Sequence, residues 1–299
     1  MNKKVIVIGG ANVDVTSFTR SEIGSGDAYP GKVELSLGGV SRNIAENLSR
    51  LGLDTSLITS LGTDGFGTMV KNNCLSLGID LSLSNLEAKR TGVFSSVLDK
   101  KNDMYLAIAD QKAVEELDEE FFKDKIEQIN QADLVFISTE LSESTLDYLT
   151  KNITTTMVTD VVSGAKSKRI KEFYERFDVI KMNEIEAEIF FDEKVTEENY
   201  ERILGETKDV NLIITRGSRS LFYKWDNKIG ISEIKIVDAQ NTNGAGDAFI
   251  SGVIYSYLNN FDLTKILEFA KSCSTLTIAD ERTNTDLMSV EKIMELINE

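Results

Sequence analysis

The stretch from Asn241 to Phe249 holds residue types that could act on a phosphate group. Gly244 and Gly246 mark the point where a polar loop turns into an apolar helix, and Asp247 follows at once. Unpaired N–H groups at a helix start attract anions, and glycines let the backbone close around a phosphate. A carboxylate there suits a base that deprotonates an alcohol, yet it equally suits the first turn of any helix. Spacing alone leaves both interpretations open.

Polar groups in the first fifty residues could bind a sugar. Asn12 and Asp14 follow a predicted strand, and an ionised carboxylate there can accept hydrogen bonds from vicinal hydroxyls. A turn stabilised by side-chain hydrogen bonds is the alternative. Gly38 and Gly39 precede Asn43 at the start of a predicted helix, where small residues would let a ligand approach closely. An ordinary helix entry explains the same pattern.

Three later strand ends carry further candidates. Asn183 and Glu186 are three apart and would share one face of a starting helix, an oxygen pair that suits magnesium or simply the helix dipole. Thr215 and Gly217 end the next strand and could approach a nucleotide. Lys166 could reach a substrate carbonyl or phosphate, or could be one of several surface lysines.

The elements that position these residues alternate between strand and helix, which predicts a mainly parallel sheet with helices on both faces. Residues 13–37 and 92–108 interrupt the alternation and predict β-strands that project from the sheet as a lid. Strands are expected at 5–10, 55–61, 134–138, 156–160, 179–182 and 211–215, and helices at 41–51, 65–77, 118–131, 142–151, 166–177, 248–258, 262–278 and 290–297.

Composition bounds the function. The 299 residues, 41% of them apolar, suffice for one domain over residues 1–299 with a sizeable core. There is no histidine, and Cys74 and Cys273 are far apart, which excludes His-based metal sites and Ser-His or Cys-His catalysis and fits a cytoplasmic setting. A net charge of −16 argues against a nucleic-acid partner, and no segment is long and apolar enough to predict a membrane partner.

Together these residues resemble the ribokinase-like, or PfkB-type, carbohydrate kinase family. The run Gly38–Asn43 is similar to its N-terminal signature, and Asn241–Asp247 to its C-terminal one. The resemblance implies a three-layer α/β/α fold with a β-strand lid, often a homodimer clasp, and ATP-dependent phosphorylation of a ribose 5′-hydroxyl with Mg²⁺. It assigns Asp247 as base, Gly244, Ala245 and Gly246 as anion hole, Asn12, Asp14, Gly39, Asn43 and Lys166 to the substrate, Asn183, Thr215, Gly217 and Thr242 to ATP, and Glu186 to the metal.

Within the family the chain most resembles the pseudouridine kinases, in the runs 30–33, 38–48, 160–163 with Lys166, and 283–287. Other acceptors remain as alternatives, namely ribose, an ordinary nucleoside such as adenosine, or a fructose-type sugar, as does a nucleoside sensor without catalysis. One departure concerns Asn241, because family members activated by K⁺ commonly have aspartate there. The resemblance therefore leaves a monovalent-cation site open.

Overall fold

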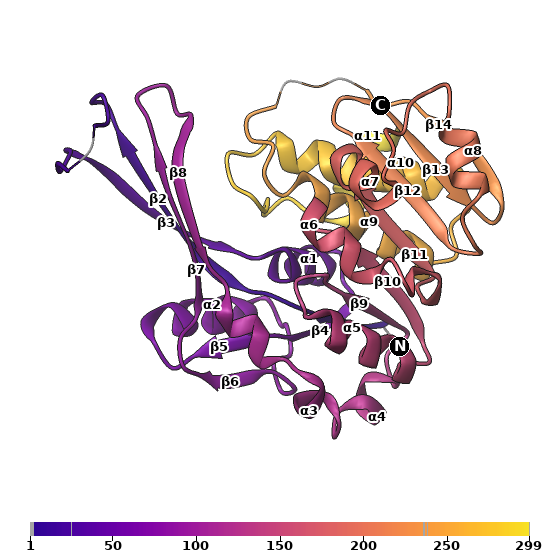
Figure 1. The fold of residues 1–299 in the computed structure, drawn as a ribbon, viewed down its shortest axis with the longest axis horizontal. Coiled ribbons are helices and arrows are strands. Elements are labelled where there is room, and N and C mark those ends of the chain that lie inside the picture. The colour runs from indigo at the N-terminus through magenta and orange to yellow at the C-terminus, as the bar shows by residue number, and fades with distance from the viewer. Residues whose placement is uncertain (1–2, 25, 236, 238, 299) are drawn as a thin grey trace.

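The computed structural model describes residues 3–24, 26–235, 237 and 239–298. In this part of the chain an eight-stranded sheet forms the frame of the molecule (Figure 1). From one edge to the other its strands are β14 (Lys228–Ser232), β13 (Arg219–Trp225), β12 (Asn211–Arg216), β11 (Val179–Asn183), β10 (Thr156–Asp160), β9 (Leu134–Ile137), β1 (Lys4–Ile8) and β4 (Asp54–Ile58). The strands from β12 to β4 run parallel, whereas β13 and β14 form an antiparallel hairpin at one edge.

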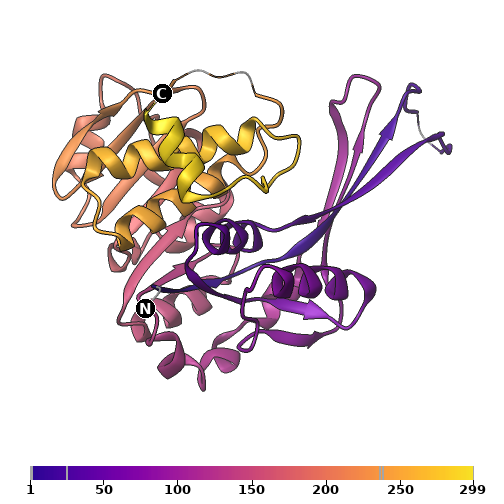
Figure 2. The same ribbon diagram turned by 180° about the vertical axis from the view of Figure 1, so that it is seen from behind.

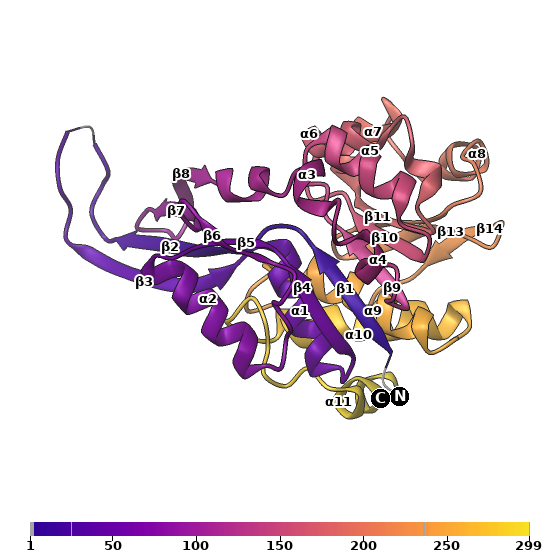
Figure 3. The ribbon, with the colours of Figure 1, turned by 90° about the horizontal axis from the view of Figure 1, so that it is seen from below.

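Helices cover both faces of this sheet, which confirms the predicted three-layer α/β/α arrangement (Figure 3). On one face lie α1 (Val40–Arg50), α2 (Gly65–Ser76), α9 (Ala245–Leu258) and α10 (Leu263–Ile278), with α11 (Val290–Asn298) packed on α10 (Figure 2). On the other lie α3 (Glu119–Phe122), α4 (Ile126–Ile129), α5 (Glu143–Asn152), α6 (Gly164–Ser167), α7 (Glu184–Phe191) and α8 (Tyr200–Gly205).

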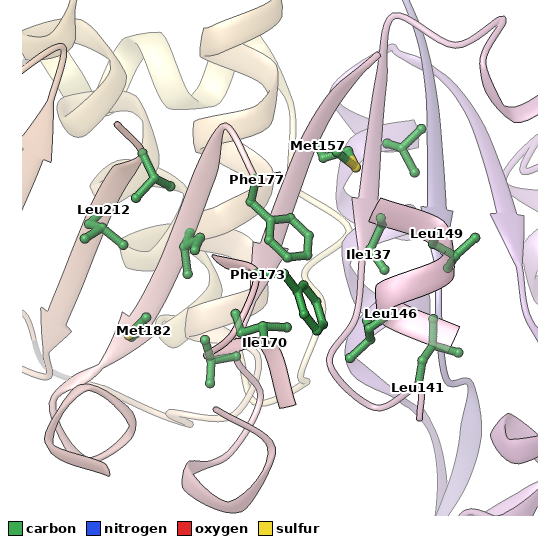
Figure 4. Packing of buried hydrophobic residues seen from close by; sticks show 14 of the residues in the cluster. Ile137, Leu141, Leu146, Leu149, Met157, Ile170, Phe173, Phe177, Met182 and Leu212 are labelled. Carbon is green, nitrogen blue, oxygen red and sulfur yellow. The ribbon is translucent and has the colours of Figure 1, made fainter. Parts of the chain in front are cut away.

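Strand β1 shows why the sequence produces two cores. Its side chains alternate, so that Val5 and Val7 join the cluster under α1, α9 and α10, while Ile6 and Ile8 join the opposite one. A parallel strand covered on both faces must be apolar throughout, as this one is. Figure 4 shows part of the second cluster, where Phe173 and Phe177 fill the space beside Leu146 of α5.

A second sheet forms the lid. It contains β3 (Gly31–Gly38), β2 (Asn12–Thr19), β7 (Gly92–Leu98) and β8 (Met104–Asp110) in that order, and Figure 1 shows it extending away from the main body. The lid strands lie where the sequence predicts them, except that β2 begins and β3 ends one residue outside the predicted range and β8 runs two residues further. Residue 25, inside the predicted range 13–37, lies outside the described residues. A short pair, β5 (Ser60–Gly62) and β6 (Asn85–Ala88), lies near the base of the lid.

Several predicted elements are wrong in detail. The helix expected at 118–131 is two short helices, α3 and α4, because a turn at Lys123–Lys125 lets Phe122 and Ile129 each reach the core. The helix expected at 166–177 divides into the end of α6 and the 3₁₀ segments η2 (Lys168–Ile170) and η3 (Tyr174–Arg176). The strand expected at 55–61 divides between β4 and β5, which belong to different sheets. The β13–β14 hairpin and the 3₁₀ segment η1 (Lys112–Glu116) were not predicted.

Among the described residues, no helix is long and apolar enough to cross a lipid bilayer.

Candidate active site

The candidate residues gather at the carboxyl ends of the parallel strands, the edge where α/β sheets bind ligands. Asp160 ends β10, Asn183 ends β11, and Thr215 lies one residue before the end of β12. Helix α9 starts beside them: a Cβ on Gly246, in its first turn, would lie 3.0 Å from Nζ of Lys181 in β11. Residues more than sixty positions apart in the chain therefore share one site.

The start of α9 is built by glycine. Gly244 is the N-cap residue with a left-handed φ of 77°, and a Cβ there would lie 2.1 Å from the carbonyl oxygen of Thr283. Only glycine combines this φ with so close an approach. Because a glycine cap brings no side chain to the first turn, its N–H groups stay available to an anion. The predicted anion hole thus has the required backbone.

Asp247 lies in that first turn and is only 9% exposed. Nδ2 of Asn43, in α1, donates a 2.7 Å hydrogen bond to its Oδ2. Burial raises the pKa of Asp247 to about 7, with Asp160 adding to the rise and the Asn43 donor, Lys181 and Arg42 opposing it. A carboxyl group with that pKa can accept a proton near neutral pH.

Three carboxylates surround one buried ammonium next to the anion hole. Nζ of Lys181 donates a 2.7 Å hydrogen bond to Oδ2 of Asp160. Burial alone would lower the pKa of Lys181, but Asp160, Glu186 and Asp247 outweigh it and raise that pKa. Burial raises the pKa of Glu186, with a contribution from Asp160 that Lys181 opposes. The cluster has more negative than positive charge, which favours a further cation.

The acceptor side of the site begins at Asp14. Nδ2 of Asn12 donates a 2.5 Å hydrogen bond to Oδ1 of Asp14, so the two predicted sugar contacts lie together. A Cβ on Gly38 would lie 2.5 Å from Oδ2 of Asp14, and one on Gly39 would lie 2.6 Å from the carbonyl oxygen of Gly10. Burial raises the pKa of Asp14, against the Asn12 donor and the charge of Arg42. Gly38 therefore makes room for this carboxylate, whereas Gly39 lets the backbone at Gly10 approach closely.

Lys166 faces Glu140, a buried residue that the sequence analysis did not select. Their Nζ and Oε1 atoms are 3.7 Å apart, and Glu140 also accepts a 3.1 Å hydrogen bond from the N–H of Gly10. Glu140 lines a pocket together with Asn12, Gly92 and Gln111. Lys166 therefore lies next to a pocket that is lined by Asn12, one of the predicted sugar contacts.

Asn183 and Glu186 form a reciprocal capping box at the start of α7. Oδ1 of Asn183 accepts from the N–H of Glu186 at 2.9 Å, while Oε2 of Glu186 accepts from the N–H of Asn183 at 2.7 Å. This supports the structural interpretation of the pair and leaves Oε1 of Glu186 outside the box. The residues can therefore cap the helix and hold a ligand together.

The other candidate nucleotide-binding residues make few contacts with the rest of the site. The hydroxyl of Thr215 donates to the carbonyl of Met182 at 3.3 Å. Gly217 has a φ of 64° and is exposed, as is Thr242, and no hydrogen bond joins either to another candidate among the described residues. Nδ2 of Asn241 donates to the carbonyl oxygen of Glu281 at 2.8 Å. A donor aimed at that carbonyl does not fit a tight monovalent-cation site.

Four residues with contacts in this site were missed as candidates: Arg42, Glu140, Asp160 and Lys181. Asp160 and Lys181 are charged residues at or near the ends of otherwise apolar strands, a signal that could have identified them. Arg42 and Glu140 have no such signal, because their roles depend on contacts between distant segments.

Comparison with known proteins shows the family of this chain. Residues 2–289 match the pfkB family carbohydrate kinases, and the chain belongs to that family. It is 26% identical over 301 residues to the pseudouridine kinase of Escherichia coli (strain K12), covering 98% of this chain and 96% of that enzyme. The family consists of ATP-dependent kinases with alcohol groups as acceptors, so this chain is a sugar or nucleoside kinase of the ribokinase-like fold.

Two solved structures resemble the fold closely. A candidate sugar kinase from Clostridium perfringens superimposes with a TM-score of 0.87 at 29% identity, covering 99% of this chain and 96% of that one. The ribokinase of Arabidopsis thaliana, complexed with ribose and ATP, also gives a TM-score of 0.87, at 18% identity and with complete coverage of both chains at 100%. The second likeness concerns the fold alone.

Proposed function

We propose that this protein transfers the γ-phosphoryl group of ATP to the 5′-hydroxyl of pseudouridine, giving pseudouridine 5′-phosphate and ADP. The observation that carries the proposal is the buried Asp247 carboxylate, held by Asn43 at the glycine-built start of α9. A base and a set of anion-binding amides in one helix turn serve the two requirements of alcohol phosphorylation.

The reaction follows from these positions. Asp14 and Asn12 hold the sugar hydroxyls while Asp247 takes the proton of the 5′-hydroxyl. The freed oxygen bonds to the γ-phosphorus as the bond from that phosphorus to the β–γ bridging oxygen breaks, and ADP leaves with the electron pair. The N–H groups of Gly244, Ala245 and Gly246 stabilise the charge of the transferred group. The lid excludes water, which would otherwise be phosphorylated in place of the alcohol.

Magnesium fits the donor set. Glu186 and Asp160 are buried oxygen ligands in a cluster with excess negative charge. The described residues contain no group of three or more side chains that could hold a metal ion alone, and Mg²⁺ in kinases is held by one or two carboxylates plus substrate phosphates and water. When bound, the metal would neutralise phosphate charge.

The pair of Lys166 and Glu140 favours an acceptor with a pyrimidine-type base. Lys166 supplies donors and Glu140 an acceptor next to the pocket lined by Asn12, and such a base presents both carbonyl groups and N–H groups. We expect Lys166→Met to raise the KM for pseudouridine while leaving the KM for ATP unchanged. The similarity to the E. coli enzyme points to the same acceptor.

A panel of acceptors in an ADP-release assay tests the substrate. Pseudouridine, uridine, adenosine, ribose and fructose are compared at equal concentration, and pseudouridine should give the highest kcat/KM. A preference for ribose or for another nucleoside would contradict the proposed acceptor but not the proposed kinase activity. Binding of pseudouridine without any ATP turnover would instead indicate a nucleoside sensor.

We also propose that the protein is cytoplasmic, since its proposed substrate ATP is present in the cytoplasm. We further propose that it is a homodimer joined through its lid. The outer strands β3 and β8 carry exposed apolar side chains that nothing in the described part of the protomer covers: Val33, Leu35, Met104, Leu106 and Ile108. Edge strands of this kind favour pairing with a second chain.

A further inference from the structure

Arg42 is a buried cation of α1 that the proposed chemistry does not yet use. Its Nη1 donates to Oε2 of Glu46 at 2.5 Å, and its Nη2 to the carbonyl oxygen of Leu37 at 3.1 Å. Nη2 also donates to Oδ1 of Asn284 at 3.0 Å. These contacts come from three separate segments, so the guanidinium is fixed in place.

The same guanidinium contacts the side chain of the next residue. Nη2 of Arg42 donates to Oδ1 of Asn43, while Nδ2 of Asn43 donates to Asp247 at 2.7 Å. Arginine can only donate and an ionised carboxylate can only accept. Only one orientation of the Asn43 amide satisfies both neighbours. Flipping it would place oxygen against carboxylate and nitrogen against guanidinium.

Asn284 ties this arrangement to the loop between α10 and α11. Its Nδ2 donates to the carbonyl oxygen of Asn43 at 3.1 Å and to Oδ1 of Asn47 at 3.0 Å. The preceding residue, Thr283, provides the carbonyl that abuts Gly244 at the anion hole. One loop therefore contacts both the start of α9 and the Arg42 side chain.

We propose that Arg42, held by Asn284, is a positioning residue that sets the orientation of the Asn43 amide and thereby aims the Asp247 carboxylate at the acceptor hydroxyl. The inference rests on the proposed function. Arg42 acts through Asn43 and does not touch the reacting atoms. Without Arg42, the Asn43 amide loses its preference for one orientation, and Asp247 loses a fixed hydrogen-bond donor.

Electrostatics supports the same role. The charged groups facing Asp247 are Asp160, Lys181 and Arg42, and both the Asn43 donor and the Arg42 charge lower the pKa of Asp247 against its burial. Arg42 also faces Glu46, Asp14 and Cys74. Removing Arg42 should therefore move the acid limb of the rate profile to higher pH.

The test uses Arg42→Met combined with Glu46→Gln, which avoids leaving an uncompensated buried carboxylate. We expect kcat to fall about 10- to 100-fold, the scale of a misplaced catalytic group, with an unchanged KM for ATP. Arg42→Lys should recover part of this loss, because an ammonium keeps the charge but matches the acceptors poorly. Asn284→Ala, which removes no charge, should lower kcat in the same direction.

Arg50→Gln is the matched control, since Arg50 shares Glu46 at 2.8 Å and pairs with Asp286 of the same loop. It should reduce thermal stability but keep kcat and the pH profile. Combining Asn43→Ala with the Arg42 variant should cost no more than the larger single effect.

Additive losses, or an Arg50→Gln effect as large as that of Arg42, would overturn the inference. So would wild-type kcat and pH dependence in the folded Arg42 and Asn284 variants. A wild-type protein that phosphorylates no acceptor on the panel would instead overturn the proposed function.

Discussion

Asp247 is the proposed base, and its surroundings affect both its pKa and its orientation. Burial raises the pKa of Asp247 to about 7, while the hydrogen bond from Asn43 fixes the orientation of its carboxylate. A surface aspartate in a helix first turn would have neither property. Both properties of the proposed base therefore depend on the packing of α1 against α9.

Asp247→Asn should lower kcat roughly 100-fold or more, because the amide cannot take the hydroxyl proton. Binding of pseudouridine, measured by calorimetry, should change little. Asp262→Asn is the matched control, since Asp262 caps α10 and asparagine caps equally well. Turnover of Asp247→Asn close to that of the wild type would contradict the assigned base.

The kcat/KM for the acceptor should fall as the pH drops through about 7, because Asp247 must be ionised to accept a proton and burial places its pKa there. The profile is measured with saturating ATP between about pH 5.5 and 8.5. The residual activity of Asp247→Asn should lack this limb. A wild-type kcat/KM that stays constant across this range would contradict the expectation that Asp247 titrates near pH 7 and acts as the base.

At the scale of elements, the carboxyl ends of the strands and the starts of α7 and α9 meet at the candidate site. Short contacts between segments fix their positions. The start of α9 and the loop after α10 touch at Gly244 and Thr283, with no space for a side chain between them. The capping box of α7 likewise fixes Glu186 at the edge of β11. The capping box is local, whereas the contact of Gly244 with Thr283 joins distant segments, and each places a candidate site residue.

Gly244→Ala should lower kcat by about 10-fold or more, because the new methyl group would displace the Thr283 loop and shift the anion hole. Gly78→Ala is the control. Gly78 has a similar φ of 73° but no atom within 4 Å of the added Cβ. Backbone strain should cost each variant about 1–2 kcal/mol of unfolding free energy, and Gly244→Ala should lose more because its methyl group meets the Thr283 carbonyl. Equal kinetics for the two variants would show that the contact with Thr283 is unimportant.

At the scale of the whole molecule, we propose that the lid covers the acceptor within one protomer and pairs with a second copy through its edge strands. The lid extends away from the main body (Figure 1). Its base carries Asn12 and Asp14, whereas its outer strands expose apolar side chains. A lid that closes over the acceptor and pairs with a second copy would link assembly to substrate binding.

Leu106→Lys in β8 should shift the protein from dimer to monomer in light scattering, because a charge would be buried at the proposed interface. Leu75→Lys in α2 is the matched control, since the two leucines are 52% and 53% exposed. A wild type that is monomeric at micromolar concentration, or equal dissociation in both variants, contradicts the lid dimer.

Local patterns in the sequence predict much of this protein. The apolar strands, the glycines at Gly38 and Gly244 and the helix-start carboxylates are encoded in short runs, since period and capping depend on neighbours in the chain. They predict the sheet, the lid strands and the two signatures of the site. They fail at 118–131 and 166–177, where reaching the core overrides a continuous helix.

Tertiary structure alone decided which polar groups touch. Asn43 and Asp247 are 204 residues apart, and Arg42 and Asn284 are 242 apart. No local period records such a pairing, because it depends on how α1, α9 and the loop after α10 pack together. The candidate catalytic residues can therefore be identified from the sequence. The orientation of the base comes from the packed fold, because the amide of Asn43 has a single orientation only when Arg42 and Asp247 lie on opposite sides of it.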